Sequence, residues 1–147
     1  VAGLIDGEGY IGIHKGKNGY RNGKPRDLKY SVGMSIANTD IRMMNWIITH
    51  FGGSVSKDNR TRIGHKDCYR WQIYGQKMLE FLKLVEPHLK VKYLQAQIVI
   101  DWQSKVKNGG KYSVSDEEKQ KREEVYRYIK KLNKRGRPEI NINNNSI

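Results

Sequence analysis

The first nine residues, Val1-Ala2-Gly3-Leu4-Ile5-Asp6-Gly7-Glu8-Gly9, constrain the fold more than any other stretch of the chain. They are typical of a helix end, with Gly9 expected as a left-handed cap directly before a strand. Gly3 and Gly7 lie one turn apart on the same helix face, although each costs about 1 kcal/mol against alanine. Glu8 puts a carboxylate where the helix dipole disfavours negative charge by roughly 0.3–1 kcal/mol. Local rules broken together in this way indicate a functional site.

Both departures have one chemical explanation. Because Gly3 and Gly7 carry no side chains, a second helix can approach this face almost backbone to backbone. The last carbonyls of the helix and the carboxylate of Glu8 together make an oxygen-rich site for a divalent cation such as Mg²⁺. The alternative is an ordinary helix with two packing glycines and a solvated glutamate.

A formal net charge of +13 and an isoelectric point near 9.8 favour a polyanionic partner. At 147 residues the chain is long enough for one well-cored domain. We expect no membrane partner, since the longest apolar runs are far shorter than about 20 residues. The single cysteine, Cys68, excludes an intrachain disulfide framework and fits a reducing compartment. No signal peptide is visible, and because the chain starts inside a helix without methionine, we expect further residues upstream of Val1.

Alternating apolar residues from Tyr10 to Lys17 and from Lys29 to Ile36 predict two strands of an antiparallel hairpin, with one apolar and one polar face. The connection between them, residues 18–26, is polar, basic and rich in glycine. It is too long for a tight turn, so we expect a mobile loop suited to gripping phosphates.

The rest of the chain predicts further strands from Ser54 to Asn59 and from Cys68 to Tyr74. Helices are expected from Ile41 to Phe51, Gln76 to Val85, after Leu89-Lys90-Val91-Lys92 to about Val106, and over about 115–133. The last helix opens on a capping box at Ser115 and has sparse apolar positions, which predict light packing. Residues 1–133 are therefore expected to form one domain, followed by a basic, Asn-rich and disordered tail at 134–147.

This order predicts an α+β fold, αββαββα, with one antiparallel four-stranded sheet covered by helices on one face, plus a C-terminal helix. The opposite face stays polar and basic. A strand of about eight residues spans about 26 Å, close to eight base pairs at about 3.4 Å each, so this face can follow a DNA groove. The base readers expected from strand parity are Tyr10, His14, Asn18, Lys29, Ser31, Ser35, Ser56, Arg70 and Gln72. Those expected to hold phosphates are Arg21, Arg26, Arg60, Arg62 and Lys66.

The opening string resembles the LAGLIDADG signature of homing endonucleases, with Val1 for the first Leu, Gly7 for the second Ala and Glu8 for the second Asp. The resemblance covers roughly residues 1–106, with weaker motifs at residues 36–40 and 89–96. It implies the same fold, with the sheet as a DNA-binding saddle. It also implies an intron-encoded homodimer that cuts a long pseudo-palindromic DNA target with Mg²⁺, with Mn²⁺ or Ca²⁺ as substitutes in binding. The expected location is an organelle (mitochondrion or chloroplast) or a prokaryotic cytoplasm.

By the same resemblance, Glu8 and the Gly7 carbonyl are metal ligands, and Lys92 is the basic residue near the scissile phosphate. Asn38 and Arg42 match a second catalytic polar pair. The glutamate at position 8 is one methylene longer than the more frequent aspartate. The expected dimer interface comprises Ala2, Gly3, Asp6 and Gly7, with Asp6 supporting the helix pair rather than the metal.

Two other functions fit the same scaffold. The chain would be an intron maturase if its basic saddle binds structured intron RNA, with or without cleavage. It would be a DNA-binding domain without catalysis if the acidic site were lost, and the presence of Glu8 together with Lys92 argues against that loss. In an assay with Mg²⁺ and a plasmid carrying the insertion locus, linear product supports the enzyme and retarded but uncut DNA supports the binding module. Preferential affinity for intron RNA supports the maturase.

Overall fold

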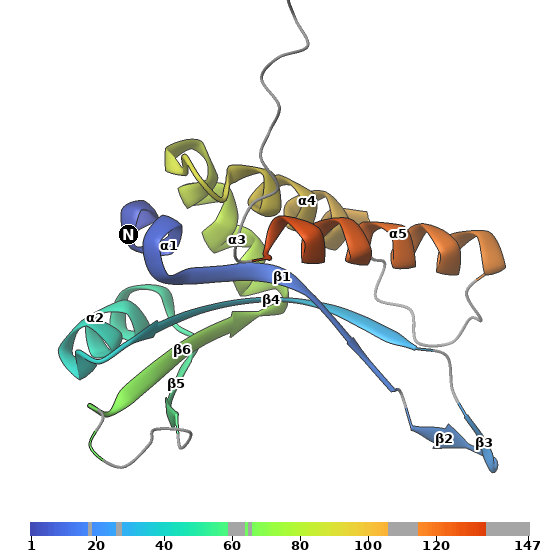
Figure 1. Cartoon of the computed structure of the whole chain (residues 1–147), viewed down its shortest axis with the longest axis horizontal. Coiled ribbons are helices and arrows are strands. Elements are labelled where there is room, and N and C mark those ends of the chain that lie inside the picture. Colours follow the sequence, from blue (N-terminus) through green and yellow to red (C-terminus); the bar gives the residue numbers. More distant parts are fainter. Residues whose placement is uncertain (18, 26–27, 59–63, 65, 106–114, 135–147) are drawn as a thin grey trace, which may run out of the picture.

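The computed structural model describes residues 1–17, 19–25, 28–58, 64, 66–105 and 115–134 (Figure 1). Helices and strands follow the expected α+β order, with a small extra hairpin between the first two long strands. The elements are α1 (Ala2–Glu8), β1 (Gly9–Gly16), β2 (Tyr20–Arg21), β3 (Lys24–Pro25), β4 (Lys29–Asn38), α2 (Ile41–Phe51), β5 (Ser54–Asp58), β6 (Cys68–Tyr74), α3 (Gly75–Val85), the 3-10 turn η1 (Glu86–His88), α4 (Tyr93–Lys105) and α5 (Asp116–Leu132).

Four strands form one antiparallel sheet in the order β1-β4-β6-β5. The sheet is arched, with α3, α4 and α5 on one side and its opposite face open (Figure 1). The alternation seen in the sequence sets the covered face, where Ile11, Met34, Ile36 and Trp71 are buried. They share one core with apolar residues of the covering helices, which confirms the predicted two-layer fold.

The connection expected as a long loop contains a tight hairpin, so that prediction was wrong for residues 20–25. Strands β2 and β3 pair antiparallel, with Arg21 opposite Lys24. Between them Asn22 and Gly23 have φ angles of 51° and 74°. Positive φ at both central residues is the geometry of a type I′ turn, which Asn-Gly adopts readily. The Asn-Gly pair was therefore the signal that the sequence interpretation overlooked.

The expected left-handed cap at Gly9 is also wrong, because this residue is extended, with φ −79° and ψ 156°. The chain passes from α1 into β1 without a left-handed residue. Glycine is needed there for space, since a Cβ atom at Gly9 would lie 2.6 Å from the carbonyl oxygen of Ile5. This close approach brings the end of α1 directly against the start of the sheet.

Helix α5 is held more firmly than its sparse apolar pattern predicted. Ile129 is 1% exposed and belongs to the main core, and Ser115 caps the helix by accepting from the Glu118 N–H at 3.2 Å. Val125 and Tyr126 also pack against this core, and Glu123 adds polar contacts to Lys15 and Tyr30 that counting apolar residues could not include. Within the described residues, no helix is both long enough and apolar enough to cross a bilayer.

Candidate nucleic-acid interface and active site

The C-terminal end of α1 meets the C-terminal end of β4. Because Gly9 pairs with Ile36 in the antiparallel sheet, the residues just before Gly9 lie beside those just after Ile36. The Asn38 Nδ2 donates to the Glu8 carboxylate at 2.6 Å. The Asn38 Oδ1 accepts from the Asp40 backbone N–H at 2.8 Å. The Asn38 side chain is thus fixed at both ends and holds the exposed Glu8 carboxylate in one direction.

Asp6 ties the same helix end to the segment that precedes α4. Its carboxylate accepts from the backbone N–H groups of Lys90, Val91 and Lys92 at 2.8, 3.1 and 2.9 Å. The Lys92 ammonium in turn donates to the Asp6 carbonyl oxygen. Partial burial raises the pKa of Asp6, but these backbone hydrogen bonds outweigh it and hold that pKa below its ordinary value. Asp6 therefore fixes the segment that carries Lys92 against the end of α1.

We expect Asp6→Asn to lower the free energy of unfolding by about 1–3 kcal/mol at neutral pH. The neutral amide of asparagine has one acceptor oxygen, whereas the charged carboxylate accepts from three backbone N–H groups. A depressed folded-state pKa stabilises the protein above the unfolded value, and this gain disappears as pH falls through the folded value. The difference from wild type should therefore shrink below pH 3.8. Urea denaturation at pH 7 and near pH 3 measures it.

The matched control for this prediction is Asp101→Asn. Asp101 forms an exposed pair with Lys105 one turn away, at 2.7 Å, and such pairs contribute little to stability. A loss of stability in Asp6→Asn that is no larger than in Asp101→Asn, or that does not change with pH, would contradict the role of Asp6 in fixing the segment before α4.

Arg42 lies near this centre but contacts its own helix start. Asp40 caps α2 by accepting from the Arg42 N–H at 2.9 Å, and the Arg42 guanidinium pairs with both oxygens of that carboxylate, at 3.1 and 2.8 Å. Hydrogen bonds from Arg42 lower the pKa of Asp40 to about 2. The structure thus brings Glu8 to Asn38 and Lys92 to Asp6, while Arg42 pairs with Asp40.

The oxygen donors at this helix end fit an open cation site. Among the described residues, no three His, Cys, Asp or Glu side chains converge as a metal site. Glu8 is exposed, and Gly7 lies in the last turn of α1, where carbonyls lack partners further along the helix. Mg²⁺ is usually bound by one or two carboxylates with waters and substrate phosphates. One carboxylate per chain therefore fits a cation completed by another molecule.

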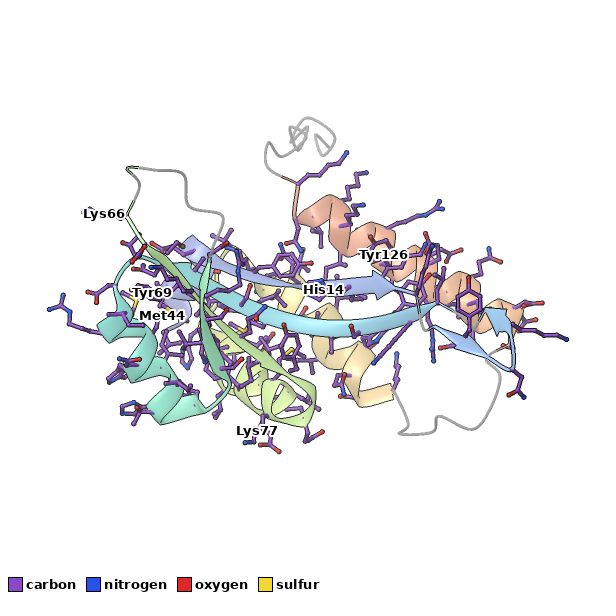
Figure 2. The ribbon with its side chains drawn as sticks, turned by 90° about the horizontal axis from the view of Figure 1, so that it is seen from below. His14, Met44, Lys66, Tyr69, Lys77 and Tyr126 are labelled. Carbon is purple, nitrogen blue, oxygen red and sulfur yellow. The ribbon has the colours of Figure 1, made fainter. Side chains whose placement is uncertain are left out.

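The open face of the sheet gathers the residues that strand parity assigned to it. In the observed register Tyr10 is opposite Ser35, which is opposite Gln72, and His14 is opposite Ser31. Arg70 is opposite Ser56 on the edge strand. Figure 2, seen from below, shows this face with His14 near its middle.

Two glycines leave room for aromatic rings on this face. A Cβ at Gly12 would lie 2.3 Å from the Tyr10 hydroxyl oxygen, and one at Gly33 would lie 3.0 Å from both His14 and Tyr74. The Tyr10 and His14 rings are 5.5 Å apart. Burial raises the pKa of Tyr10, so its hydroxyl stays protonated. Tyr74 was not predicted, although it follows Gln72 by two residues and shares its face.

These rings line a hollow of about 400 Å³, together with Ser35, Arg70 and Gln72. Ser35 is only 7% exposed, unlike the exposed reader that was expected. The Arg70 guanidinium donates to its hydroxyl at 3.5 Å and pairs with Asp58 at 3.2 Å. The Ser35 hydroxyl is therefore used to position the Arg70 guanidinium and is little exposed on the open face.

The other predicted contacts divide between exposed and undescribed positions. Lys29, Ser31, Ser56 and Lys66 are exposed, and Arg21 lies in β2. Residues 18, 26, 60 and 62, which carry the predicted Asn18, Arg26, Arg60 and Arg62, lie outside the described residues.

The glycine face of α1 is open in the single chain. A Cβ atom at Gly3 or Gly7 would have no heavy atom within 4 Å among its described neighbours. Both glycines are exposed, whereas Ala2 and Asp6 are half-buried. This face is free to receive another helix.

Comparison with known proteins agrees with the fold. A sequence model described as LAGLIDADG endonuclease matches residues 1–96. The fold resembles the homing endonuclease I-CvuI, solved with DNA and Mg, at a TM-score of 0.72 and 18% identity, covering 93% of this chain and 82% of that one. It also resembles the archaeal intron-encoded I-Vdi141I complexed with DNA (TM-score 0.70, 16% identity, 92% and 82% covered) and I-TnaI (TM-score 0.60, 21% identity, 89% and 91% covered). No curated protein sequence matches the chain.

Proposed function

This chain belongs to the LAGLIDADG endonuclease family and is a DNA endonuclease of that type, and from this premise we propose that it is an intron-encoded homing endonuclease. Acting as a homodimer, it cuts a long, pseudo-palindromic double-stranded DNA target by Mg²⁺-dependent phosphodiester hydrolysis. The observation that carries this proposal is the exposed Glu8 carboxylate, aimed by Asn38, at the end of a helix whose glycine face is open.

The open glycine face supports a second copy of the chain as partner. A twofold axis beside Gly3 and Gly7 packs two α1 helices together and brings both Glu8 carboxylates to the axis. Each carboxylate then serves one DNA strand. Two cuts, one in each strand, follow from the symmetry of such a dimer.

The residues at the helix end supply the chemistry of hydrolysis. Glu8 and the Gly7 carbonyl would hold a divalent cation, which would supply charge stabilisation for phosphodiester hydrolysis. Lys92, held beside the last turn of α1 by Asp6, offers a positive charge to the scissile phosphate or orients the water. Asn38 orients the Glu8 carboxylate, and Asp40 positions the Arg42 guanidinium at the start of α2.

The open sheet face supports DNA as the substrate. The rows of polar and aromatic side chains follow β1 and β4 away from Glu8, and a net charge of +13 suits a polyanion. In this proposal His14, Arg70 and Gln72 contact base edges, and the exposed lysines contact phosphates. Relatives that share the fold were solved with DNA, and I-CvuI was solved with Mg and with Ca.

The proposal is tested in two steps. Selection from randomised duplexes first identifies the bound sequence, which is then placed in a supercoiled plasmid. We expect linear product with Mg²⁺ and none with EDTA, at a single position. A retarded but uncut plasmid would indicate a DNA-binding protein without catalysis, and tighter binding of intron RNA than of any duplex would indicate a maturase.

A further inference from the structure

Helix α5 runs along β1 and is attached to it near both ends of their contact (Figure 1). At its C-terminal end, the Asn133 Nδ2 donates to the Ile11 carbonyl oxygen at 2.9 Å. The Gln95 Nε2 of α4 donates to the Asn133 Oδ1 at 3.4 Å, and Ile129 is buried in the core. This end of α5 is thus fixed to the proximal part of β1 and to α4.

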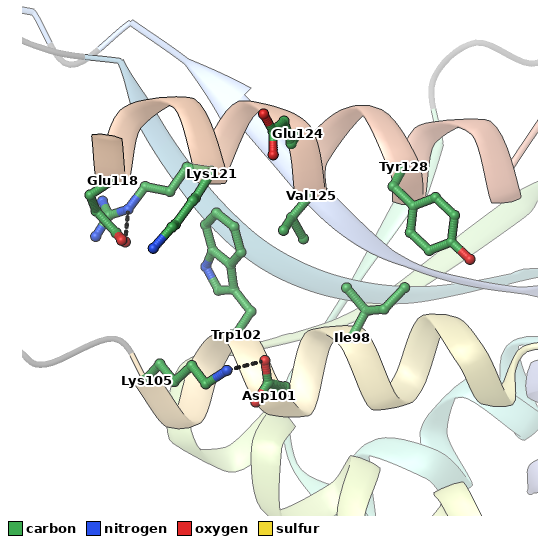
Figure 3. Close-up of a pocket in the computed structure, with 10 residues that line it drawn as sticks. Ile98, Asp101, Trp102, Lys105, Glu118, Lys121, Glu124, Val125 and Tyr128 are labelled. Atoms are coloured by element: carbon green, nitrogen blue, oxygen red, sulfur yellow. Dashed lines mark hydrogen bonds and ion pairs between the residues drawn. The ribbon is translucent and has the colours of Figure 1, made fainter. Parts of the chain in front are cut away.

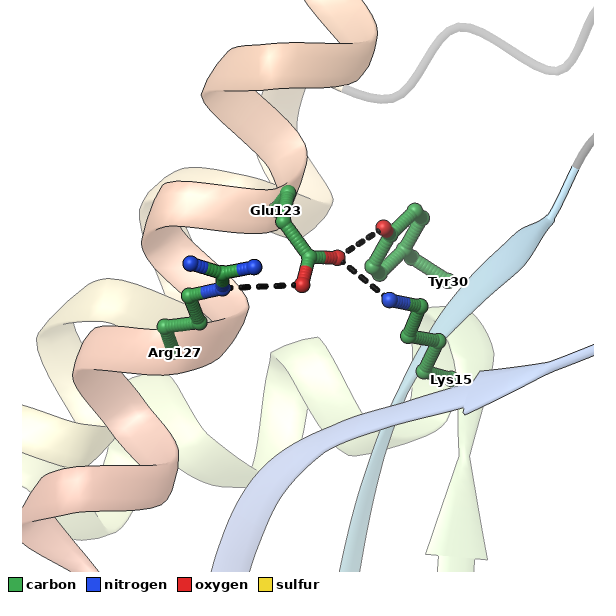
Figure 4. Close-up of polar contacts among 4 residues, drawn as sticks. All are labelled: Lys15, Tyr30, Glu123 and Arg127. Atoms are coloured by element: carbon green, nitrogen blue, oxygen red, sulfur yellow. Dashed lines mark hydrogen bonds and ion pairs between the residues drawn. The ribbon is translucent and has the colours of Figure 1, made fainter.

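The second attachment is a polar cluster around Glu123 (Figure 4). One carboxylate oxygen accepts from the Lys15 ammonium at 2.7 Å and from the Tyr30 hydroxyl at 2.5 Å. The other accepts from Arg127, one turn along the same helix, at 3.0 Å. Lys15 and Tyr30 are direct cross-strand partners in β1 and β4. Glu123 therefore binds β1 and β4 at the same register position.

The two attachments have matching spans. Ten helical residues separate Glu123 from Asn133, about 15 Å at 1.5 Å each. Four strand residues separate Ile11 from Lys15, about 13 Å at 3.3 Å each. A helix fastened at both ends over similar lengths restricts bending and twisting of the strand between the two attachments.

The middle of α5 contacts the hairpin, through Glu123 and Tyr126. A cavity of about 390 Å³ lies between α4 and α5, with Ile98 and Trp102 on one side and Val125 and Tyr128 on the other (Figure 3). The Tyr30 ring, by contrast, lies 5.9 Å from the Tyr126 ring of α5. The Glu123 cluster is thus a polar link that fixes the middle of α5 to the sheet.

The residue pairs on either side of Lys15 and Tyr30 lie on the open sheet face that is proposed to bind DNA. His14 and Ser31 form the cross-strand pair on one side of Lys15 and Tyr30, and Gly16 and Lys29 the pair on the other. Strand alternation points these pairs to the open face. Lys15 lies seven residues beyond Glu8, about 23 Å along the strand, or about seven base pairs.

We propose that Glu123 is a positioning residue for DNA recognition, which fixes the distal half of the β1–β4 hairpin and so sets the base preference about seven base pairs from the cut. This inference rests on the proposed function, because it needs the open face to bind DNA. The carboxylate stays ionised in any ordinary assay, since hydrogen bonds from Lys15, Tyr30 and Arg127 lower the pKa of Glu123 to about 2.

The test compares base preference position by position, by selection from randomised duplexes and then by binding to singly substituted targets. In Glu123→Gln we expect discrimination at the outer positions to fall from about tenfold, a typical mismatch effect, to below threefold. Discrimination near the centre should not change. Arg127→Gln is the matched control, because it loses the contact within α5 and keeps both contacts to the hairpin.

Tyr30→Phe removes the hydrogen bond from the Tyr30 hydroxyl to Glu123 and keeps the ring. It therefore tests the Glu123 cluster without disturbing the packing. It should reproduce the outer-position loss to a smaller extent. A wild-type profile in both Glu123→Gln and Tyr30→Phe, or an equal loss at every position, would overturn the inference and leave the proposed function intact. A wild-type protein that selects no duplex would instead overturn the proposed function.

Discussion

Glu8→Gln is expected to slow DNA cleavage by at least about 10³-fold while DNA affinity stays within about threefold of wild type. Glutamine has the same shape as glutamate, and its carbonyl oxygen can still accept from Asn38, as the carboxylate does at 2.6 Å. The charge that holds the cation is lost. Stabilisation by a bound cation contributes several kcal/mol, and a loss of about 4 kcal/mol is about 10³ in rate. Single-turnover cleavage and filter binding measure the two effects separately.

The length of the side chain provides a control for this prediction. Glu8→Asp retracts the carboxylate by one methylene and breaks the contact with Asn38, which should slow cleavage by about 10²-fold. Adding Asn38→Gln lengthens the partner by one methylene and should recover about tenfold of that loss. Cleavage by Glu8→Gln at the wild-type rate would refute the role assigned to the carboxylate.

Gly3→Leu is expected to give a folded monomer that no longer makes double-strand cuts. Apart from its chain neighbours and its own helix backbone, no described heavy atom lies within 4 Å of a Cβ placed at Gly3, so a side chain can start there without a clash. Leucine is also the better helix former, by roughly 0.5–1 kcal/mol. The same side chain would keep two α1 helices from close approach. We therefore expect unchanged or higher protomer stability together with a loss of at least about 10²-fold in linear product.

Sedimentation velocity and plasmid cleavage check this prediction together. Gly3→Ala adds one methyl group and should weaken the dimer less than leucine does, which gives a graded series. A Gly3→Leu protein that sediments as a dimer at the same protein concentration as the wild type would show that the glycine face is not the interface. An unfolded variant would contradict the open surroundings of Gly3.

The sheet was predictable because its faces follow a local rule. Strict alternation assigned Ile11, Met34 and Trp71 to the covered face, and the structure buries all three. The type I′ turn at Asn22-Gly23 was also predictable, because its residues are the standard signal for that turn. Alternation likewise extends from Gln72 to Tyr74.

The contacts that shape the candidate site could not be predicted in the same way. Asp6 accepts from backbone groups 84 to 86 residues away, and Glu123 accepts from Lys15 at a separation of 108 residues. Polar contacts of this range leave no periodic pattern in the sequence. Hydrophobic spacing therefore described α5 as lightly packed, although its charged residues hold it along β1.

A crystal structure of the protein with its target duplex and Ca²⁺ is the most direct measurement of the shared active site. We expect two copies related by a twofold axis, α1 packed against α1 through Gly3 and Gly7, and both Glu8 carboxylates beside cations at the scissile phosphates. Helix ends far apart, with no ion next to either Glu8, would contradict cleavage at a shared site.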